Sequence, residues 1–195
     1  KIDILVVTQL LSKGFHFSKL NCIVVVDADF SSHGYDLRSA EKNIQLYHQL
    51  AGRAGREGNK STIYFQTYTP DDEILINLTK NDPNYFLKKE LLLRKEKKLP
   101  PFFRLISLII SGKNEHSVMK FAFNIKSNLP KLDEVNVLGP VLAPITKLRK
   151  KYRSRILIRY PKNLYIQKYL SESLNKIKLI SGIKLEVDVD PINFS

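Results

Sequence analysis

The chain of 195 residues is long enough for one domain or two small ones, and its 43% hydrophobic and 26% charged residues are ordinary for a folded protein. No apolar run approaches the roughly 20 residues that a membrane span needs. The net charge of +13 is uneven: residues 1–98 hold 15 basic against 12 acidic residues, whereas residues 99–195 hold 17 against 7. The basic second half predicts a polyanionic partner, either nucleic acid or an anionic membrane surface, although a merely solubilising surface has the same composition.

The cysteine and histidine content argues against a metal centre. Cys22 is the only cysteine, which excludes an internal disulfide and a thiolate zinc cage. The four histidines are scattered without ligand spacing, so we expect no metal site. The single thiol fits a reducing compartment, and we expect a cytoplasmic protein. Because its neighbours are apolar, we interpret Cys22 as a buried strand residue.

The first half has the pattern of the end of an α/β domain. Three short apolar runs are typical of strands: residues 4–7, 22–26 and 61–67. Residues 39–50 carry apolar side chains at helical spacing and predict a helix between the second and third runs. Strands that alternate with helices and are apolar along their length indicate a parallel sheet covered on both faces. A helical pattern over residues 71–98 ends at Leu99-Pro100-Pro101, where we place a domain boundary.

The second half has an internally symmetric order of elements. Strands are predicted at residues 104–110, 135–138, 155–160 and 184–189. One helix is predicted at 115–129, with Val118, Phe121, Ala122 and Ile125 on one face, and another at 164–178. The resulting order, βαββαβ, is that of a ferredoxin-like domain. The predicted fold class is therefore α/β, with a parallel sheet followed by this small domain.

A cluster of cations lies in the connection between two strands predicted in the second half. Six cations fall within nine residues: Lys147, Arg149, Lys150, Lys151, Arg153 and Arg155. Tyr152 stands among them and can stack on an unpaired base or a sugar. A hairpin tip of this kind can follow a phosphate backbone, and its binding would weaken steeply with salt. The alternative is a solvated charge run that prevents aggregation at the sheet edge.

The most specific pattern is the string Gln49-Leu50-Ala51-Gly52-Arg53-Ala54-Gly55-Arg56, at the end of the predicted helix. Two guanidinium groups three residues apart can reach one anionic ligand together, and the planar Arg fork pairs well with phosphate oxygens. An arginine placed in this way can neutralise the charge that builds on a γ-phosphate in the transition state. A helix end capped by glycine would also hold Gly and Arg, but would not need the whole string.

This string resembles motif VI of superfamily 2 helicases, Q-x-x-G-R-x-G-R, which closes the ATP site from the second RecA-like lobe. The resemblance implies that Gln49 senses the nucleotide and that Arg53 and Arg56 contact the γ-phosphate as arginine fingers.

The segment of residues 8–17 is similar to motif V of the same superfamily. That similarity implies contacts of Thr8, Gln9 and Lys13 with DNA, and a coupling turn at Gly14 that contributes to the nucleotide site. Phe15 and His16 depart from the acidic residue that many superfamily members carry after this glycine, so a generic ribose contact is not expected.

Further landmarks narrow the resemblance to one family. They lie at residues 27–29, 35–41, 99–102, 138–145 and 188–191. In this order they resemble the primosomal protein N′ (PriA) family of replication-restart helicases, from about residue 3 to residue 192. The resemblance implies that residues 1–98 are the C-terminal part of RecA-like lobe 2 with trailing helices. Residues 99–195 would then be the C-terminal DNA-binding domain.

For the intact family member, the resemblance implies an ATP-dependent 3′-to-5′ DNA helicase that recognises stalled or abandoned forks. Its implied partners are forked or branched DNA, primosome proteins and single-strand-binding protein. Since the sequence has no G-x-x-x-x-G-K-[ST] loop and no Asp-Glu-x-His box, the chain alone is expected to be inactive. ATP and Mg belong to the intact protein, and zinc to an upstream part. The alternatives are another superfamily 2 helicase or translocase, or a non-catalytic nucleic-acid-binding module.

Overall fold

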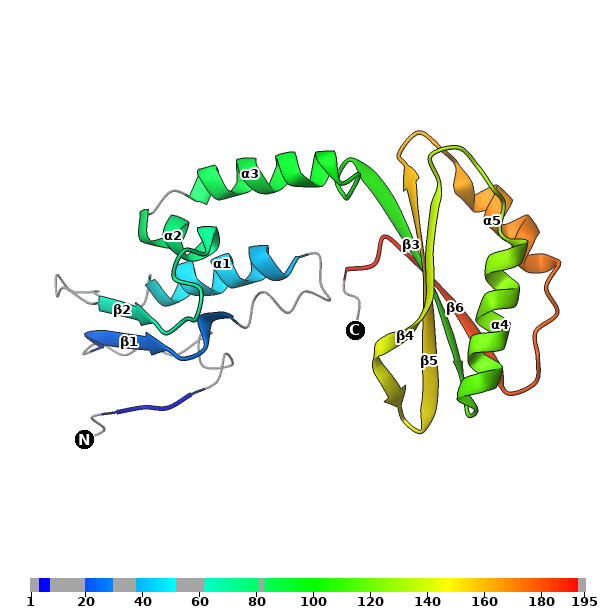
Figure 1. Cartoon of the computed structure of the whole chain (residues 1–195), viewed down its shortest axis with the longest axis horizontal. Coiled ribbons are helices and arrows are strands. Elements are labelled where there is room, and N and C mark those ends of the chain that lie inside the picture. Colours follow the sequence, from blue (N-terminus) through cyan, green and yellow to red (C-terminus); the bar gives the residue numbers. More distant parts are fainter. Residues whose placement is uncertain (1–3, 8–19, 30–37, 52–61, 81–82, 193–195) are drawn as a thin grey trace. The chain divides into compact units, whose positions relative to one another are not determined.

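The computed structural model describes residues 4–7, 20–29, 38–51, 62–80 and 83–192, and the chain forms two compact units, Lys1–Lys88 and Lys89–Ser195 (Figure 1). The division runs through helix α3 (Pro83–Glu96), whereas the sequence places the domain boundary after residue 98. The first unit contains a parallel sheet and the second an antiparallel one, so the chain is of the mixed α/β class. None of the helices in the described ranges is long and apolar enough to cross a membrane.

The parallel sheet of the first unit consists of β1 (Cys22–Val25) and β2 (Thr62–Phe65), with Cys22 opposite Thr62. Helix α1 (Ser39–Ala51) connects the two strands, and α2 (Glu73–Lys80) follows β2. Two of the three predicted strands, those at residues 22–26 and 61–67, and the predicted helix are confirmed here. Three buried residues of this unit form a small hydrophobic cluster: Ala28, Tyr47 and Leu75. The Tyr47 ring meets Phe65 edge-on with centroids 5.0 Å apart, which ties α1 to β2.

Three predictions about the first unit are wrong. The sheet is not covered on both faces: Val24 and Tyr64, neighbours across the ladder, are 59% and 58% exposed. Cys22 lies on the same face and is exposed rather than buried, because apolar neighbours do not tell a strand's covered face from its open one. Residues 4–7 form no strand, since a strand needs a hydrogen-bonded neighbour and the described part of β1 pairs only with β2.

Asp29 fastens the carboxyl ends of the two parallel strands together. Its carboxylate accepts hydrogen bonds from the Thr67 hydroxyl, from the Thr69 hydroxyl at 2.7 Å and from the Tyr68 backbone N–H at 2.6 Å. These donors favour the ionised form and lower the pKa of Asp29 to about 2, with the Thr67 hydroxyl as the main cause.

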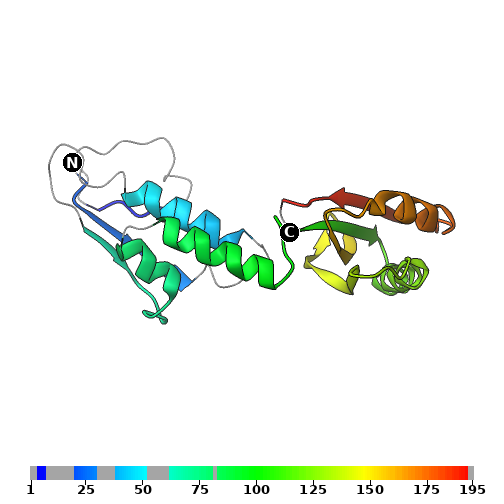
Figure 2. The same cartoon turned by 90° about the horizontal axis from the view of Figure 1, so that it is seen from above.

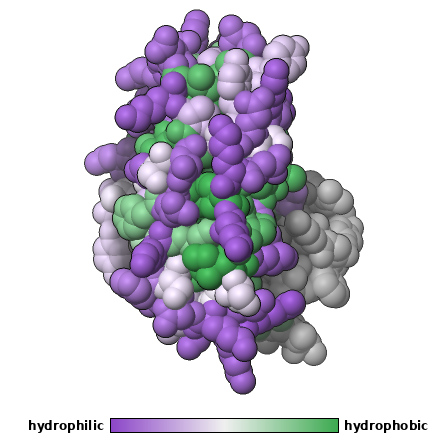
Figure 3. Space-filling view, turned by 90° about the vertical axis from the view of Figure 1, so that its right-hand side faces the viewer, coloured by the Kyte–Doolittle hydropathy of each residue, from purple (hydrophilic) through white to green (hydrophobic). Residues whose placement is uncertain are grey.

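The second unit is built on a four-stranded antiparallel sheet in the order β4-β5-β3-β6. The strands are β3 (Phe103–Gly112), β4 (Asn136–Leu148), β5 (Lys151–Pro161) and β6 (Ile183–Val189). The helices are α4 (Glu115–Asn128), which follows β3, and α5 (Ile166–Asn175), which follows β5. Figures 1 and 2 show both helices on the same side of the sheet. Figure 3 faces this side and shows hydrophilic side chains around a central apolar area.

The core of the second unit lies between the sheet and these two helices. Helix α4 contributes the four residues predicted to share its buried face: Val118, Phe121, Ala122 and Ile125. The two central strands contribute alternate residues: Ile106, Leu108 and Ile110 from β3, and Ile156, Ile158 and Tyr160 from β5. Because side chains alternate along a strand, the intervening residues lie on the opposite face, which we call the helix-free face.

Strand β4 is longer than the strand predicted from the sequence, which ends at residue 138. It continues through Pro140 and Pro144 to Leu148, with register shifts between Leu138 and Val141 and between Leu142 and Lys147. Proline is tolerated there because β4 is an edge strand, whose outer N–H groups need no partner. The second helix, in contrast, is shorter than the predicted range of 164–178.

The C-terminal half of α3 is fastened to the second unit. Arg94, which is buried, donates from Nε to Glu90 at 2.8 Å and from Nη1 to the Pro100 carbonyl at 3.3 Å. Arg159 of β5 donates from Nη1 to the carbonyl of Lys97 at 2.8 Å. These bonds hold the last turn of the helix against the start of β3.

We predict that Thr67→Val raises the pKa of Asp29 towards its usual value, because the main donor to the carboxylate is lost. A folded pKa below the unfolded value of about 3.9 means that ionised Asp29 stabilises the fold above pH 4. That contribution is lost as the pH falls towards 2. Carboxyl carbon NMR titration of the whole chain measures the shift, with the exposed Thr62→Val as the control. An unsubstituted Asp29 that titrates at its ordinary pKa would refute the assignment.

Candidate nucleic-acid interface

The predicted cation cluster forms the tip of a β-hairpin between β4 and β5. Leu148 pairs with Lys151, so only Arg149 and Lys150 remain to make the turn. Their φ angles are 50° and 64°, both in the left-handed region. A two-residue turn with both φ positive matches the twist of the flanking strands, and Asn-Gly is its usual sequence. Arg149 and Lys150 therefore adopt a backbone conformation that Asn and Gly adopt at a lower free-energy cost.

The exposure of the cations falls with distance from the tip. Lys147, Arg149, Lys150 and Lys151 are exposed, Arg153 is half-buried, and only 7% of the surface of Arg155 is exposed. Burial is the main cause that lowers the pKa of Arg155, and the neighbouring charge of Arg153 lowers it further. The exposed cations at the tip are thus the ones that a large ligand reaches first.

Strand alternation separates the tip residues onto two faces. Tyr152 pairs with Lys147 on the same face as the helices, and the Lys147 ammonium lies 5.0 Å from the ring centroid as a cation–π contact. Lys151, Arg153 and Arg155 lie on the helix-free face, two residues apart along β5. The hairpin therefore presents positive charge on both of its sides.

The other predicted site residues divide into one that is described and several that are not. Gln49 lies exposed in the last turn of α1. The two arginines of the motif, Arg53 and Arg56, lie outside the described residues. So do the four residues of the upstream segment: Thr8, Gln9, Lys13 and Gly14.

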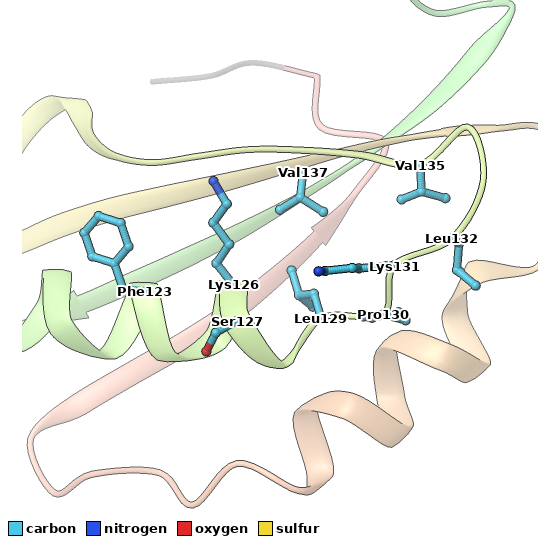
Figure 4. A pocket seen from close by; sticks show the side chains of 9 residues that line it. All are labelled: Phe123, Lys126, Ser127, Leu129, Pro130, Lys131, Leu132, Val135 and Val137. Atoms are coloured by element: carbon cyan, nitrogen blue, oxygen red, sulfur yellow. The ribbon is translucent and has the colours of Figure 1, made fainter.

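A hollow of about 540 Å³ between α4 and β4 was not predicted (Figure 4). Its lining is mainly apolar, with Phe123, Leu129 and Val137 among the contributing side chains. Lys126 points across it and donates to the Gly139 carbonyl (Figure 4). The lining residues include neither a carboxylate nor a cysteine. The only sequence signal near this hollow was Pro130, which follows α4 and favours a loop.

The sequence also did not predict the exposed aliphatic side chains along the edge strand β4. Leu138, Val141 and Leu148 of β4 are 50%, 58% and 45% exposed. Each pairs with a β5 residue on the helix-free face, so the three line one side of the cationic row. The only available signal was the alternation beyond residue 138, which the two prolines obscured.

Comparison with known proteins gives matches in both units. The model of the helicase conserved C-terminal domain matches residues 1–58, and that of the primosomal protein N C-terminal domain matches residues 95–192. Replication restart protein PriA of Rickettsia felis is 42% identical over 194 residues, which is 100% of this chain and 30% of the relative. The Haemophilus influenzae protein of the same name is 34% identical over 202 residues, 100% of this chain and 27% of the relative. The Treponema pallidum protein is 32% identical over 195 residues, 99% and 30% of the two chains.

The chain carries a segment of the helicase C-terminal class followed by a primosomal C-terminal domain. It belongs to the PriA family of replication restart proteins. The chain spans 30% of the length of the Rickettsia relative.

We predict that replacing the turn with Arg149→Asn and Lys150→Gly stabilises the second unit. A left-handed conformation costs an ordinary residue about 1 kcal/mol or more, and Asn and Gly adopt it more readily. The expected gain is about 1 kcal/mol in the free energy of unfolding, measured by urea denaturation of the whole chain. The control, Arg149→Lys with Lys150→Arg, should change nothing. A loss of stability in the Asn-Gly variant would show that the turn is not left-handed.

Proposed function

We propose that this chain is the DNA-engaging part of an ATP-dependent DNA helicase that restarts replication at stalled or abandoned forks. The observation that carries the proposal is the hairpin tip, where six cations fall within nine residues and four of them are exposed. The names of the relatives, replication restart protein PriA, support the biological role. In this proposal the intact helicase moves 3′ to 5′ and assembles the primosome.

The hairpin would bind DNA through its backbone. Lysine and arginine side chains at the tip neutralise phosphates and release counterions, so affinity depends strongly on salt. Recognition would depend on DNA structure and charge, because contacts to phosphates carry no sequence information directly. Tyr152 adds a ring on which an unpaired base or a sugar can stack once Lys147 turns to a phosphate.

The nucleotide site of the proposed helicase would use the first unit. Gln49 would sense the nucleotide, with Gly14 in the coupling turn, while Arg53 and Arg56 neutralise the γ-phosphate in the transition state. Thr8, Gln9 and Lys13 would contact DNA. The phosphate loop and the carboxylate that positions Mg would come from an upstream lobe, so ATP and Mg act only in the intact protein. Zinc would likewise belong to the upstream part.

The remaining assignments follow from the same proposal. Residues 1–98 would be the end of a RecA-like lobe and residues 99–195 the DNA-binding domain. The strand order β4-β5-β3-β6, with two helices on one face, supports a ferredoxin-like fold for the latter. The proposed partners are forked or branched DNA, primosome proteins and single-strand-binding protein. A replication protein of this kind would act in the cytoplasm.

We predict that the Asn-Gly turn variant binds forked DNA more weakly although its fold is more stable. Two fewer cations should lower the slope of log affinity against log salt by about two. Fluorescence anisotropy with forked, duplex and single-stranded DNA over a salt series measures this, with the Arg149→Lys/Lys150→Arg variant as the control. Unfolding cannot explain weaker binding by a stabilised variant. Equal binding by variant and unsubstituted chain would remove the tip from the proposed site.

We predict that Arg56→Ala abolishes the DNA-stimulated ATPase activity of the intact protein, because the charge on the γ-phosphate is then no longer neutralised. The expected loss in turnover is about a thousandfold. Arg38→Ala, which changes an arginine outside the motif, is the matched control. Full ATPase activity in the Arg56 variant would remove Arg56 from the proposed nucleotide site.

A further inference from the structure

The helix-free face of the hairpin carries two parallel rows of different chemistry. One row lies on β5 and is cationic: Lys151, Arg153 and Arg155 at every second residue, about 6.7 Å apart along the strand. The other lies on the neighbouring edge strand and is aliphatic. Leu148 pairs with Lys151, and Val141 pairs with Arg155. The Leu148 and Val141 side chains are 45% and 58% exposed, so solvent-exposed apolar surface lies beside the cations.

The charges around these rows restrict where an anionic ligand can lie. Arg155 and Arg153 are like charges on adjacent positions of one face, and a bound anion between them would relieve their repulsion. The acidic residues of this face, Glu186 and Asp188, are on β6, which β3 separates from β5. Asp188 still acts on the buried Arg155 and partly offsets the fall in the pKa of that guanidinium, so the exposed Lys151 and the half-buried Arg153 are the cations open to a ligand. Glu186 is already paired with Lys184. The β4–β5 half of the face is therefore the half that attracts a polyanion.

The aliphatic row distinguishes between polyanions. A DNA duplex keeps its bases stacked inside and presents phosphates and sugars, so exposed aliphatic side chains gain little from it. A single strand has free bases and sugars that can cover Val141 and Leu148 while its phosphates meet the cations. An acidic peptide would bind most readily by adding a strand to β4. Pro140, Pro144 and two register shifts break that edge.

We infer that the helix-free face of the β4–β5 hairpin is a track for single-stranded nucleic acid, with phosphates on Lys151 and Arg153 and bases or sugars against Val141 and Leu148. This inference rests on the proposed DNA-binding function and specifies it: the hairpin holds an unpaired strand along its flank as well as phosphates at its tip. Arg155 lies beneath the track and supplies positive charge without being exposed.

The test uses a neutral double variant, Val141→Ser with Leu148→Ser, which removes apolar surface and leaves every charge in place. The matched control is Val187→Ser with Val189→Ser. Those valines are also on an edge strand, are 46% and 45% exposed, and pair with Leu108 and Ile106 on the opposite face. Binding of a labelled oligothymidine and of a duplex of equal length is measured by anisotropy, and thermal unfolding of each variant is recorded.

The expected result is a loss of about fivefold to tenfold in affinity for oligothymidine, since contacts of a base with aliphatic side chains are weaker than stacking on aromatic rings. The salt slope and the duplex affinity should stay the same, and the control variant should bind both ligands normally. Oligothymidine binding that the Val141/Leu148 variant retains would overturn the track but leave the proposed function standing. No binding of any DNA by the unsubstituted chain would overturn the proposed function itself.

Discussion

The antiparallel pairing of β3 with β5 is the constraint on which the second unit depends. It joins Phe103–Gly112 to Tyr152–Pro161 in one continuous register. Because strand side chains alternate, this register sends Ile156 and Ile158 to the helices and Arg153 and Arg155 to the other face. A slip of one residue would bury the arginines against α4 and expose the isoleucines, so the hydrophobic core itself holds the cations outward.

Beyond the core, the hairpin tip keeps the same alternation of side chains between the two faces of the sheet. β5 is held on one side by β3 and on the other by β4, and the two-residue turn follows from the pairing of Leu148 with Lys151. Cations at left-handed positions are a local conflict between sequence and backbone, of a kind that recurs at functional sites. The prolines and register shifts of the edge strand β4 prevent another strand from adding beside the tip.

The sequence predicted those features that depend on strong periodicity or on charge. The buried face of α4 follows from helical spacing, and the cation cluster is visible without any fold. The length of β4 was hidden because Pro140 and Pro144 normally end a strand, and only its place at the sheet edge permits them. Cys22 was misplaced because burial depends on which layer covers a face, and apolar neighbours carry no such information. The left-handed turn was hidden because Arg and Lys are not its usual residues.

The central claim is that the β4–β5 hairpin meets DNA. Amide hydrogen exchange of the whole chain, with and without saturating forked DNA, tests it most directly. We expect slower exchange in bound protein over residues 141–153, with unchanged rates in α4 and α5 on the opposite face. Protection confined to those helices, with unchanged exchange at the hairpin, would contradict the account.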